Sequence, residues 1–235
     1  MRIVVNHLTR LKYGNICVAG LDADTGRHIR PVIEHHRMNS AFLRRNGGPF
    51  DIGCLVDLGA VHPVGQAPER EDHSFSLHKV RPVGEVTADE FWRLLTRAAR
   101  PTLRDIFGRD LQRRGAGATI DPLCGSASLG CLSVSRPALA VDGFKGIRLT
   151  FTEPGAVEPF NLSVTDIRLV QPDLQTPRRD AIEALARRIA DGVEVILAVG
   201  LGRAWQKESD TAPRHWLHVN NIHLVDDPTW QDAAR

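Results

Sequence analysis

Apolar and polar residues alternate near the start of the chain, and this alternation predicts strands. The β-patterned runs are Ile3 to Leu8, Asn15 to Leu21 and Arg27 to Ile33. Period-two alternation with β-branched residues fits a half-buried sheet. Asp22-Ala23-Asp24-Thr25-Gly26 leads into the third run and has the composition of a tight turn. We therefore expect the chain to open with an antiparallel meander.

Two further strands are predicted after a short helix-compatible piece. That piece runs from Asn39 to Arg45 and ends at Asn46-Gly47-Gly48-Pro49, a sequence that interrupts regular structure. Alternation resumes from Ile52 to Leu58, and His73 to Val80 is the next β-patterned run. The first part of the chain thus contains three strands, a short helical element and two strands.

Between Thr87 and Arg114 the apolar spacing becomes helical. Thr87 and Glu90 have the spacing of a capping box, in which each side chain bonds a backbone amide of the first turn. Thr102 is expected to cap a second short helix. The small, glycine-rich run from Gly115 to Gly125 reads as a linker.

The pattern after this linker repeats the earlier order. The predicted strands are Ser128 to Ser135, Phe144 to Thr152, Phe160 to Val170, Val193 to Val199 and Trp216 to Val225. A helix is predicted between the third and fourth of them, from Thr176-Pro177 to Asp191-Gly192.

Five strands with a helix between the third and fourth is an order typical of the OB-fold barrel. We predict a mainly β protein with some helix, built as two tandem five-stranded OB-like barrels joined by a helical segment. The predicted divisions are 1–84 for the first barrel, 85–124 for the helical connector and linker, and 125–227 for the second barrel.

Composition narrows the class of protein. The 235 residues are 42% hydrophobic, enough for a sizeable core, and no apolar run approaches the roughly 18 residues of a membrane span. We therefore expect a cytoplasmic protein with no membrane partner. The four cysteines lack a CxxC pair, so neither a disulfide scaffold nor a zinc ribbon is predicted. A net charge of +2 excludes a strongly basic nucleic-acid binder, so the distribution of charge has to carry any such argument.

Several short segments also resemble a known family. They are Lys12-Tyr13-Gly14-Asn15-Ile16-Cys17-Val18-Ala19-Gly20, His28-Ile29-Arg30-Pro31-Val32, Gln66-Ala67-Pro68-Glu69-Arg70-Glu71-Asp72 and Leu162-Ser163-Val164-Thr165-Asp166. Across nearly its whole length the chain resembles the bacterial dual-OB-containing domain family. The resemblance implies two OB barrels and a nucleic-acid or nucleotide ligand, in a prokaryotic conflict or defence setting. The family commonly has an aromatic residue, usually tryptophan, before the Ile-Arg-Pro motif, where this chain has His28.

OB barrels bind ligands across strands two and three and with the loops that join strands one to two and four to five. In the first barrel the candidate binding residues at these places are Arg10, Lys12, Tyr13, Arg27, His28 and Arg30. Guanidinium groups match phosphates, and planar rings stack on bases. The alternative is structural, with Arg30 pairing with a carboxylate such as Asp51 or Glu69 and Tyr13 packing in its turn.

In the second barrel basic and aromatic residues alternate in the loop after the fourth strand. The candidates are Arg203, Trp205, Lys207, Arg214 and Trp216. This alternation is typical of a groove for a single strand, where bases stack on aromatic rings. Alternatively, Trp205 and Trp216 plug the end of the barrel.

No catalytic motif, cofactor site or metal site is predicted. Adjacent histidines in a strand point to opposite faces, so His35-His36 is a poor metal pair. We expect a non-catalytic module for single-stranded nucleic acid or a nucleotide. The alternatives are a metal-dependent nuclease, with Asp51, Glu69 and Asp72 near these histidines, and an interaction scaffold without nucleic-acid binding.

Overall fold

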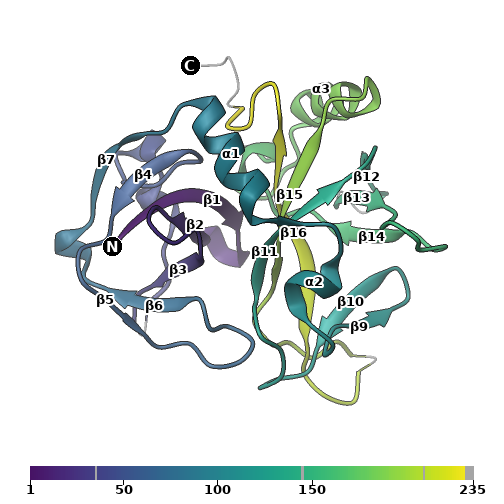
Figure 1. The fold of residues 1–235 in the computed structure, drawn as a ribbon, viewed down its shortest axis with the longest axis horizontal. Helices are drawn as coiled ribbons and strands as arrows, with labels where there is room; N and C mark the ends of the chain where they lie inside the picture. The colour runs from purple at the N-terminus through teal and green to yellow at the C-terminus, as the bar shows by residue number, and fades with distance from the viewer. Residues whose placement is uncertain (35, 144–145, 209, 231–235) are drawn as a thin grey trace.

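The structure, a computed structural model, describes residues 1–34, 36–143, 146–208 and 210–230. It is mainly β, with two curled sheets that form two halves of one molecule, and it bears out the predicted fold class. Figure 1 shows the first half in purple and blue and the second half in green and yellow, with helix α1 lying across the junction. Buried apolar side chains form one continuous cluster through both halves.

The first half is a single seven-stranded sheet. Its strands are β1 (Arg2–Arg10), β2 (Ile16–Asp22), β3 (His28–Val32), β4 (Cys54–Asp57), β5 (Val61–Pro63), β6 (Asp72–Phe75) and β7 (Arg81–Glu85). They are hydrogen-bonded in the order β5-β6-β3-β2-β1-β4-β7. The predicted opening meander is confirmed, with strand ends within a residue or two of expectation.

Pairing within this sheet follows the OB pattern. Strand β1 pairs antiparallel with both β2 and β4, and β3 pairs parallel with β6. Strands β4 and β5 follow each other closely in the chain, and β5 pairs with β6. Read as one bent strand, β4 and β5 connect β1 to β6 and curl the sheet into a barrel.

The second half contains a six-stranded and a three-stranded sheet. The six strands, in the order β8-β11-β15-β16-β10-β9, are β8 (Ala99–Arg100), β11 (Leu129–Val134), β15 (Val195–Leu201), β16 (His215–Leu224), β10 (Gly117–Ile120) and β9 (Gln112–Arg114). The other three, in the order β12-β13-β14, are β12 (Ala138–Val141), β13 (Ile147–Phe151) and β14 (Phe160–Ser163).

Here too a broken strand connects the pieces into an OB arrangement. Strand β11 pairs with β15, and β12, which follows three residues later, pairs with β13. A parallel bridge between Val164 and Val219 joins the end of β14 to β16. The circuit is therefore β11/β12, β13, β14, β16, β15 and back to β11, which is the strand order of an OB barrel.

In the described part of the chain, three α-helices accompany the sheets: α1 (Ala88–Ala98), α2 (Leu103–Phe107) and α3 (Arg179–Ala190). The predicted capping box of α1 is present, with Thr87 accepting from the Glu90 amide and Glu90 reaching back to the Thr87 amide. Helix α3 lies between the third and fourth strands of the second barrel, as predicted, but it begins at Arg179 with Arg178 at its N-cap, not at Thr176-Pro177. None of the helices in the described part of the chain combines the length and apolar character that crossing a membrane requires.

The short one-turn elements correct several predictions. They are η1 (Lys12–Gly14), η2 (Ser40–Phe42), η3 (Arg44–Asn46), η4 (Leu77–Lys79) and η5 (Ile167–Leu169). The piece predicted as helical from Asn39 to Arg45 is thus two 3-10 turns. The runs expected as strands up to Val80 and Val170 end earlier, at Phe75 and Ser163, and continue as η4 and η5.

The run predicted as a linker, Gly115 to Gly125, contains strand β10. That strand pairs with β16 on one side and β9 on the other, so it belongs to the sheet of the second half. The boundaries at 84 and 125 remain a prediction. Because β8, β9 and β10 all pair within the later sheet, we propose that the second unit begins before residue 100.

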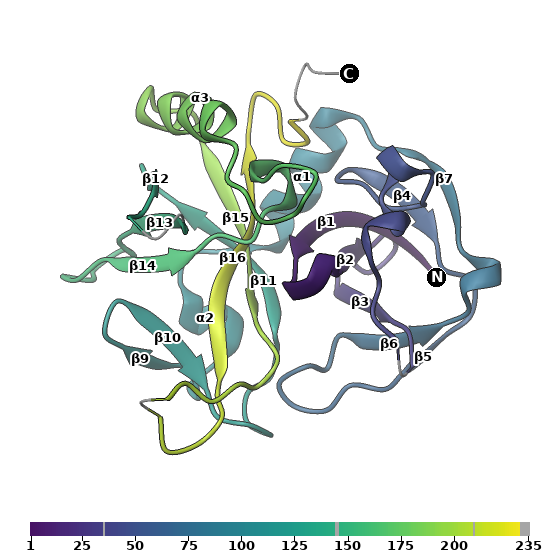
Figure 2. The same cartoon turned by 180° about the vertical axis from the view of Figure 1, so that it is seen from behind.

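The two halves meet where β1 approaches β16 (Figure 2), and side chains of β16 form polar contacts with the β1 backbone there. The Leu8 amide donates to Asn221 Oδ1 at 2.7 Å, and Asn221 Nδ2 donates to the Leu8 carbonyl at 3.2 Å. His223 Nε2 lies 3.0 Å from the Asn6 carbonyl oxygen. A buried side-chain amide therefore replaces the strand partner that Leu8 lacks at this edge of β1.

Charged side chains also connect the two halves, away from the contacts between β1 and β16. Glu71 of the first half accepts hydrogen bonds from the Ser128 amide at 2.8 Å and the Ser128 hydroxyl at 2.9 Å. Arg203 of the second half lies 2.7 Å from Glu69 and 2.6 Å from Asp72. These contacts join loops that are distant in the sequence.

Candidate functional site

A hollow of about 470 Å³ lies on one face of the second barrel. It is floored by β13, β14 and β16 and bounded by the β9–β10 hairpin and the loop between β15 and β16. This is the place where OB barrels bind ligands, namely the face of their second and third strands with the loop after the fourth. The residues that line it are Arg114, Ala116, Gly117, Arg148, Asn161, Leu162, Ser163, Gly202, Arg203, Trp205, Lys207, Trp216, Leu217 and His218.

The lining of this hollow is cationic. Arg114, Arg148 and Lys207 contribute positive charge, the charge of Arg203 is balanced by its ion pairs with Glu69 and Asp72, and none of the described residues that line the hollow is acidic. Arg148 is held in place on β13 because its Nε donates to Asn161 Oδ1 at 2.6 Å and its Nη1 donates to Ser163 Oγ at 2.5 Å. A guanidinium fixed in this way presents its remaining donors without a further loss of side-chain entropy.

Two tryptophans stand beside these cations. Trp205 is 56% exposed, so it does not plug the barrel. Backbone hydrogen bonds between Trp205 and Arg214, at 2.9 and 3.0 Å, form a short hairpin that carries the ring at the edge of the hollow. Trp216 is half-buried, and the Lys207 ammonium lies 3.1 Å from its ring centroid, a cation–π contact.

Buried polar atoms face the same hollow. His218 Nδ1 and Trp216 Nε1 are buried without a hydrogen-bond partner among the described residues. Burial, with the charges of Arg148 and Lys207 adding to its effect, lowers the pKa of His218 to about 4. The site thus contains a neutral imidazole in a positive field, where an anionic ligand is electrostatically favoured.

One candidate from the first barrel, Lys12, lies near this site, and Tyr13 is the next residue in the sequence. Lys12 Nζ is 5.9 Å from the Trp205 ring centroid, which brings the first loop of one barrel to the last loop of the other. Tyr13 follows it and is 88% exposed, so it does not pack in its turn. The Tyr13 backbone is left-handed, with φ 62°, a strained conformation for a residue other than glycine.

Two predicted residues are engaged in ion pairs, and a third is partly buried. Arg30 is buried and its Nε is ion-paired with Asp72, with Glu69 3.9 Å away, so the structural alternative for Arg30 is the one observed. Arg214 is nearly covered and pairs with Asp121. Arg10 is half-buried at the end of β1, where burial lowers the pKa of its guanidinium. None of the three lines the hollow of the second barrel.

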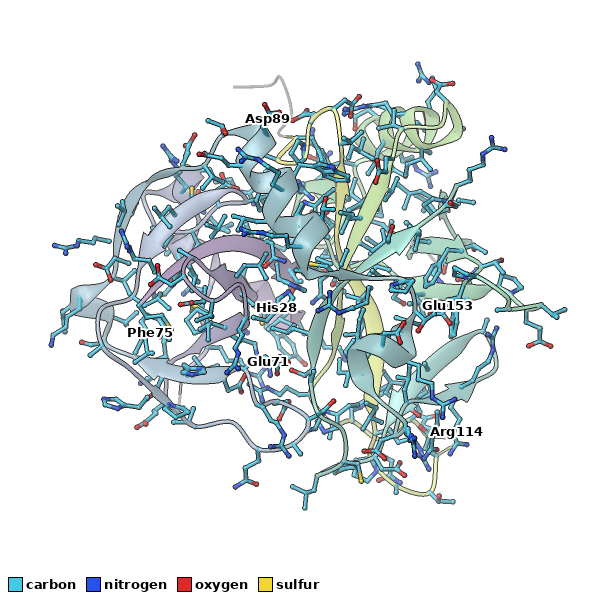
Figure 3. All side chains as sticks on the ribbon, viewed as in Figure 1. His28, Glu71, Phe75, Asp89, Arg114 and Glu153 are labelled. Atoms are coloured by element: carbon cyan, nitrogen blue, oxygen red, sulfur yellow. The ribbon has the colours of Figure 1, made fainter. Side chains whose placement is uncertain are left out.

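Arg27 and His28 line a different and larger hollow, of about 1100 Å³, between the two halves. Arg70, Arg97 and Arg100 also line it, together with Glu71. Figure 3 shows His28 and Glu71 near this junction and Arg114 far away on the β9–β10 hairpin. Some predicted residues therefore line one of these two hollows and others line neither, so together they do not form one continuous groove.

Two of the three carboxylates of the nuclease alternative, Glu69 and Asp72, are ion-paired with arginines. Asp72 is buried between Arg30 and Arg203, and Glu69 is ion-paired with Arg203. His36 is exposed, and His35 lies outside the described residues. Carboxylates neutralised by arginines are poor ligands for catalytic metal ions, so this arrangement disfavours the nuclease.

Comparison with known families decides the classification. The model of the dual OB-containing domain family matches residues 1–222. The chain belongs to this family. No curated protein and no solved structure matches it. As a dual OB protein it is classed as a binding module by fold, and the chemistry of its ligand has to be argued from the site.

In this dual OB chain, sequence reasoning missed Arg114, Arg148 and His218. Arg148 follows the alternation of β13, where Ile147 and Leu149 are buried and the residue between them points the other way. That alternation could have placed Arg148 on the ligand face of the barrel. Arg114 was hidden because its hairpin was read as the edge of a linker.

Proposed function

We propose that the protein is a non-catalytic module that binds single-stranded nucleic acid or a nucleotide on the face of its second barrel. One observation carries the proposal: four basic side chains and two tryptophans line one hollow, and no acid is among the described residues that line it. Cationic groups neutralise phosphates, and indole rings stack on bases in a way that tolerates any sequence.

The position and size of the hollow support the same ligand class. It occupies the strand face that OB barrels use for oligonucleotides, and its volume of about 470 Å³ is in the usual range for ligand pockets. Trp205 stands at the edge of the hollow, where a base entering from solvent would meet it first. Lys207, Arg148 and Arg114 are spread around the hollow, as the spaced charges of a sugar-phosphate backbone require.

The setting of this activity is also a proposal. On the family resemblance, we infer a role in a prokaryotic conflict or defence system, in the cytoplasm. The identity of neighbouring genes in bacterial genomes tests the first part of this inference. If the genes that recur beside this one in different genomes had no defence function, the inference would be contradicted.

Binding to labelled single-stranded DNA, single-stranded RNA and mononucleotides, measured by fluorescence anisotropy, tests the function. We expect the parent protein to bind without cleaving, and Lys207→Ala to weaken binding several-fold. Lys79→Ala is the matched control, because Lys79 is an exposed lysine of the first barrel, outside the hollow, and this variant should bind like the parent.

The same mixtures, incubated with Mg²⁺ and analysed on denaturing gels, separate the alternatives. Metal-dependent cleavage would support the nuclease alternative. If none of the probes bound, the interaction scaffold would be the remaining alternative. Equal losses in Lys207→Ala and Lys79→Ala would remove the second-barrel face from the proposal.

A further inference from the structure

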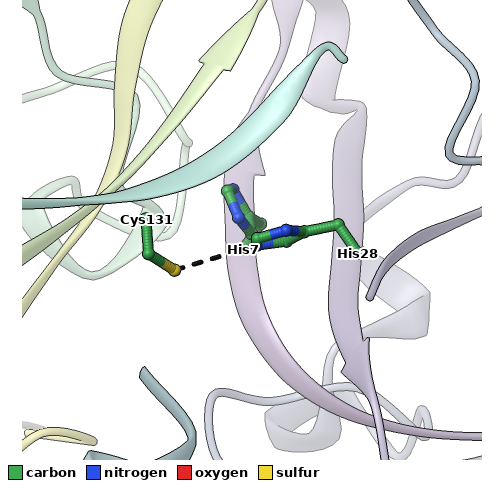
Figure 4. A group of neighbouring side chains, drawn as sticks. All are labelled: His7, His28 and Cys131. Atoms are coloured by element: carbon green, nitrogen blue, oxygen red, sulfur yellow. Dashed lines mark hydrogen bonds between the residues drawn. The ribbon is translucent and has the colours of Figure 1, made fainter. Parts of the chain in front are cut away.

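Outside the proposed ligand face, three side chains with metal-binding atoms meet where the two halves join. They are His7 on β1, His28 at the start of β3 and Cys131 on β11. One ligand atom of each lies within 4.8 Å of those of the other two. Figure 4 shows the two imidazole rings and the sulfur converging from opposite sides of the junction.

The distances in this cluster suit a small ion. Cys131 Sγ lies 3.8 Å from His28 Nε2, and the two imidazole rings pack edge to face with centroids 5.0 Å apart. For a tetrahedral Zn²⁺, ligand bonds of about 2.3 Å to sulfur and 2.0 Å to nitrogen put neighbouring donor atoms roughly 3.5 Å apart. Small side-chain movements would therefore be enough to close the site.

One polar atom of the cluster lacks the partner that a buried polar atom needs. His7 and Cys131 are fully buried, and His7 Nε2 has no hydrogen-bond partner among the described residues. The other nitrogen, Nδ1, is 3.1 Å from the Asn220 amide nitrogen. Leaving a polar atom buried and unpaired costs about 1–3 kcal/mol, a cost that a bound ion would remove.

The two imidazoles are in the protonation state that metal binding needs, and the thiol is not. Burial lowers the pKa of His28 to about 4, and it lowers the pKa of His7 well below its ordinary value, so both imidazoles are neutral and able to coordinate. Burial raises the pKa of Cys131 to about 12, so the thiol has to lose its proton to the solvent when a metal binds. Asn6 Nδ2 lies 3.4 Å from Sγ and would donate to the resulting thiolate.

We propose that His7, His28 and Cys131 form a binding site for Zn²⁺ or a similar transition-metal ion between the two barrels. Two imidazoles and one thiolate are a ligand set that zinc and cobalt accept. His28 also lines the larger hollow of about 1100 Å³, so a water molecule or a ligand atom from that hollow can fill the fourth position. The ion would fasten β1 and β3 of one half to β11 of the other.

Cobalt spectroscopy on the full chain tests this site. Protein stripped of metal with a chelator is titrated with Co²⁺, and we expect a thiolate-to-cobalt charge-transfer band that saturates at one ion per chain. Cys131→Ser should abolish the band, and Cys124→Ser should keep it, because Cys124 is an exposed thiol outside the cluster. His28→Asn should weaken cobalt binding at least tenfold.

A second measurement keeps the proposal testable if Cys131→Ser does not fold. X-ray absorption of the zinc-loaded parent protein should show one sulfur and two imidazole nitrogens in the first coordination shell. Zn²⁺ should also raise the melting temperature of the parent and of Cys124→Ser, and raise that of His28→Asn less at the same Zn²⁺ concentration. Absence of a charge-transfer band in the parent, its persistence in Cys131→Ser, or a shell without sulfur would overturn the site.

Discussion

At the scale of single residues, the proposed ligand face offers two kinds of contact, with phosphate charges and with base rings. Lys207 and Arg148 offer charge, and Trp205 offers an exposed planar surface. Charge contacts with phosphate release counterions and are sensitive to salt, while stacking on a ring is not. Measurements of salt dependence can therefore assign a role to each side chain.

Trp205→Ala is expected to weaken binding of a single strand by about 1–3 kcal/mol without changing its salt dependence, because a base face carries no counterions. Lys207→Ala should instead flatten the plot of log affinity against log salt by up to about 0.7, the value for one phosphate contact on a single strand. Titrations of both variants at several salt concentrations provide the comparison. A changed slope in Trp205→Ala would argue against stacking at this position.

His223 predicts how stability depends on pH. It is buried between the halves, where Arg168 adds to the effect of burial and lowers its pKa to about 4. The unfolded side chain takes up a proton as the pH falls through about 6.5, while the folded one stays neutral until about 4. Stability present above pH 6.5 is therefore lost between these two values, on the order of 2 kcal/mol by pH 5.

Urea unfolding at pH 7.5 and pH 5 measures this loss. His223→Gln should lose less stability than the parent over the interval, because it removes the titrating group. His62→Gln changes an exposed histidine and should keep the pH dependence of the parent. Identical losses in the parent and in His223→Gln would assign the effect to other groups.

Residue positions were predictable where the signal was local. Trp205 and Lys207 lie two residues apart in a loop, the alternation of basic and aromatic residues made both of them candidates, and both line the same hollow. Arg30 was ambiguous, because its main partner, Asp72, lies 42 residues later and is brought beside it by the parallel pairing of β3 with β6. Partners made by long-range pairing leave no pattern near the residue itself.

At the scale of elements, features set by nearby residues were again predictable, and features set by long-range pairing were not. The start of α1 was predicted correctly because its capping box lies within four residues, Thr87 to Glu90, and depends on no other part of the chain. Strand β10 was missed because Gly117–Ile120 is short and rich in small residues. Its pairing with β16, about a hundred residues later, is what places it in the main sheet of the second half.

Thr87→Ala is expected to destabilise the protein by about 1 kcal/mol, since it removes the hydroxyl that accepts from the Glu90 amide. Thr96→Ala is the control. Thr96 is exposed in the same helix and its hydroxyl donates to the Trp92 carbonyl, a contact already served by the helix, so the change should stay within about 0.5 kcal/mol. Chemical denaturation of both variants gives the comparison, and equal effects would contradict a capping role.

At the scale of the whole molecule, the contacts between β1 and β16 predict that the two barrels unfold together. Asn221→Ala removes both hydrogen bonds to Leu8 and leaves its buried amide and carbonyl unpaired, at a cost of about 1–3 kcal/mol. Asn46→Ala, which removes an exposed hydrogen bond to Ser40, should cost less.

Calorimetry of the parent and Asn221→Ala tests this prediction. A single transition in the parent, shifted to lower temperature in Asn221→Ala, is the expected result. Two separate transitions in the parent would show that the barrels unfold independently, and an unshifted transition in the variant would remove the Asn221 contacts from the interface.

The pairing of Leu8 with Asn221 also has a consequence for synthesis on the ribosome. The two residues are 213 positions apart, so β1 emerges from the exit tunnel long before its partner on β16 is translated. Domains fold from the N-terminus during synthesis, so the first barrel can form early while one edge of β1 remains solvated. Final docking waits for the last strand to be made. Such high contact order predicts a late, slow step in which water at this edge is exchanged for the side chains of β16.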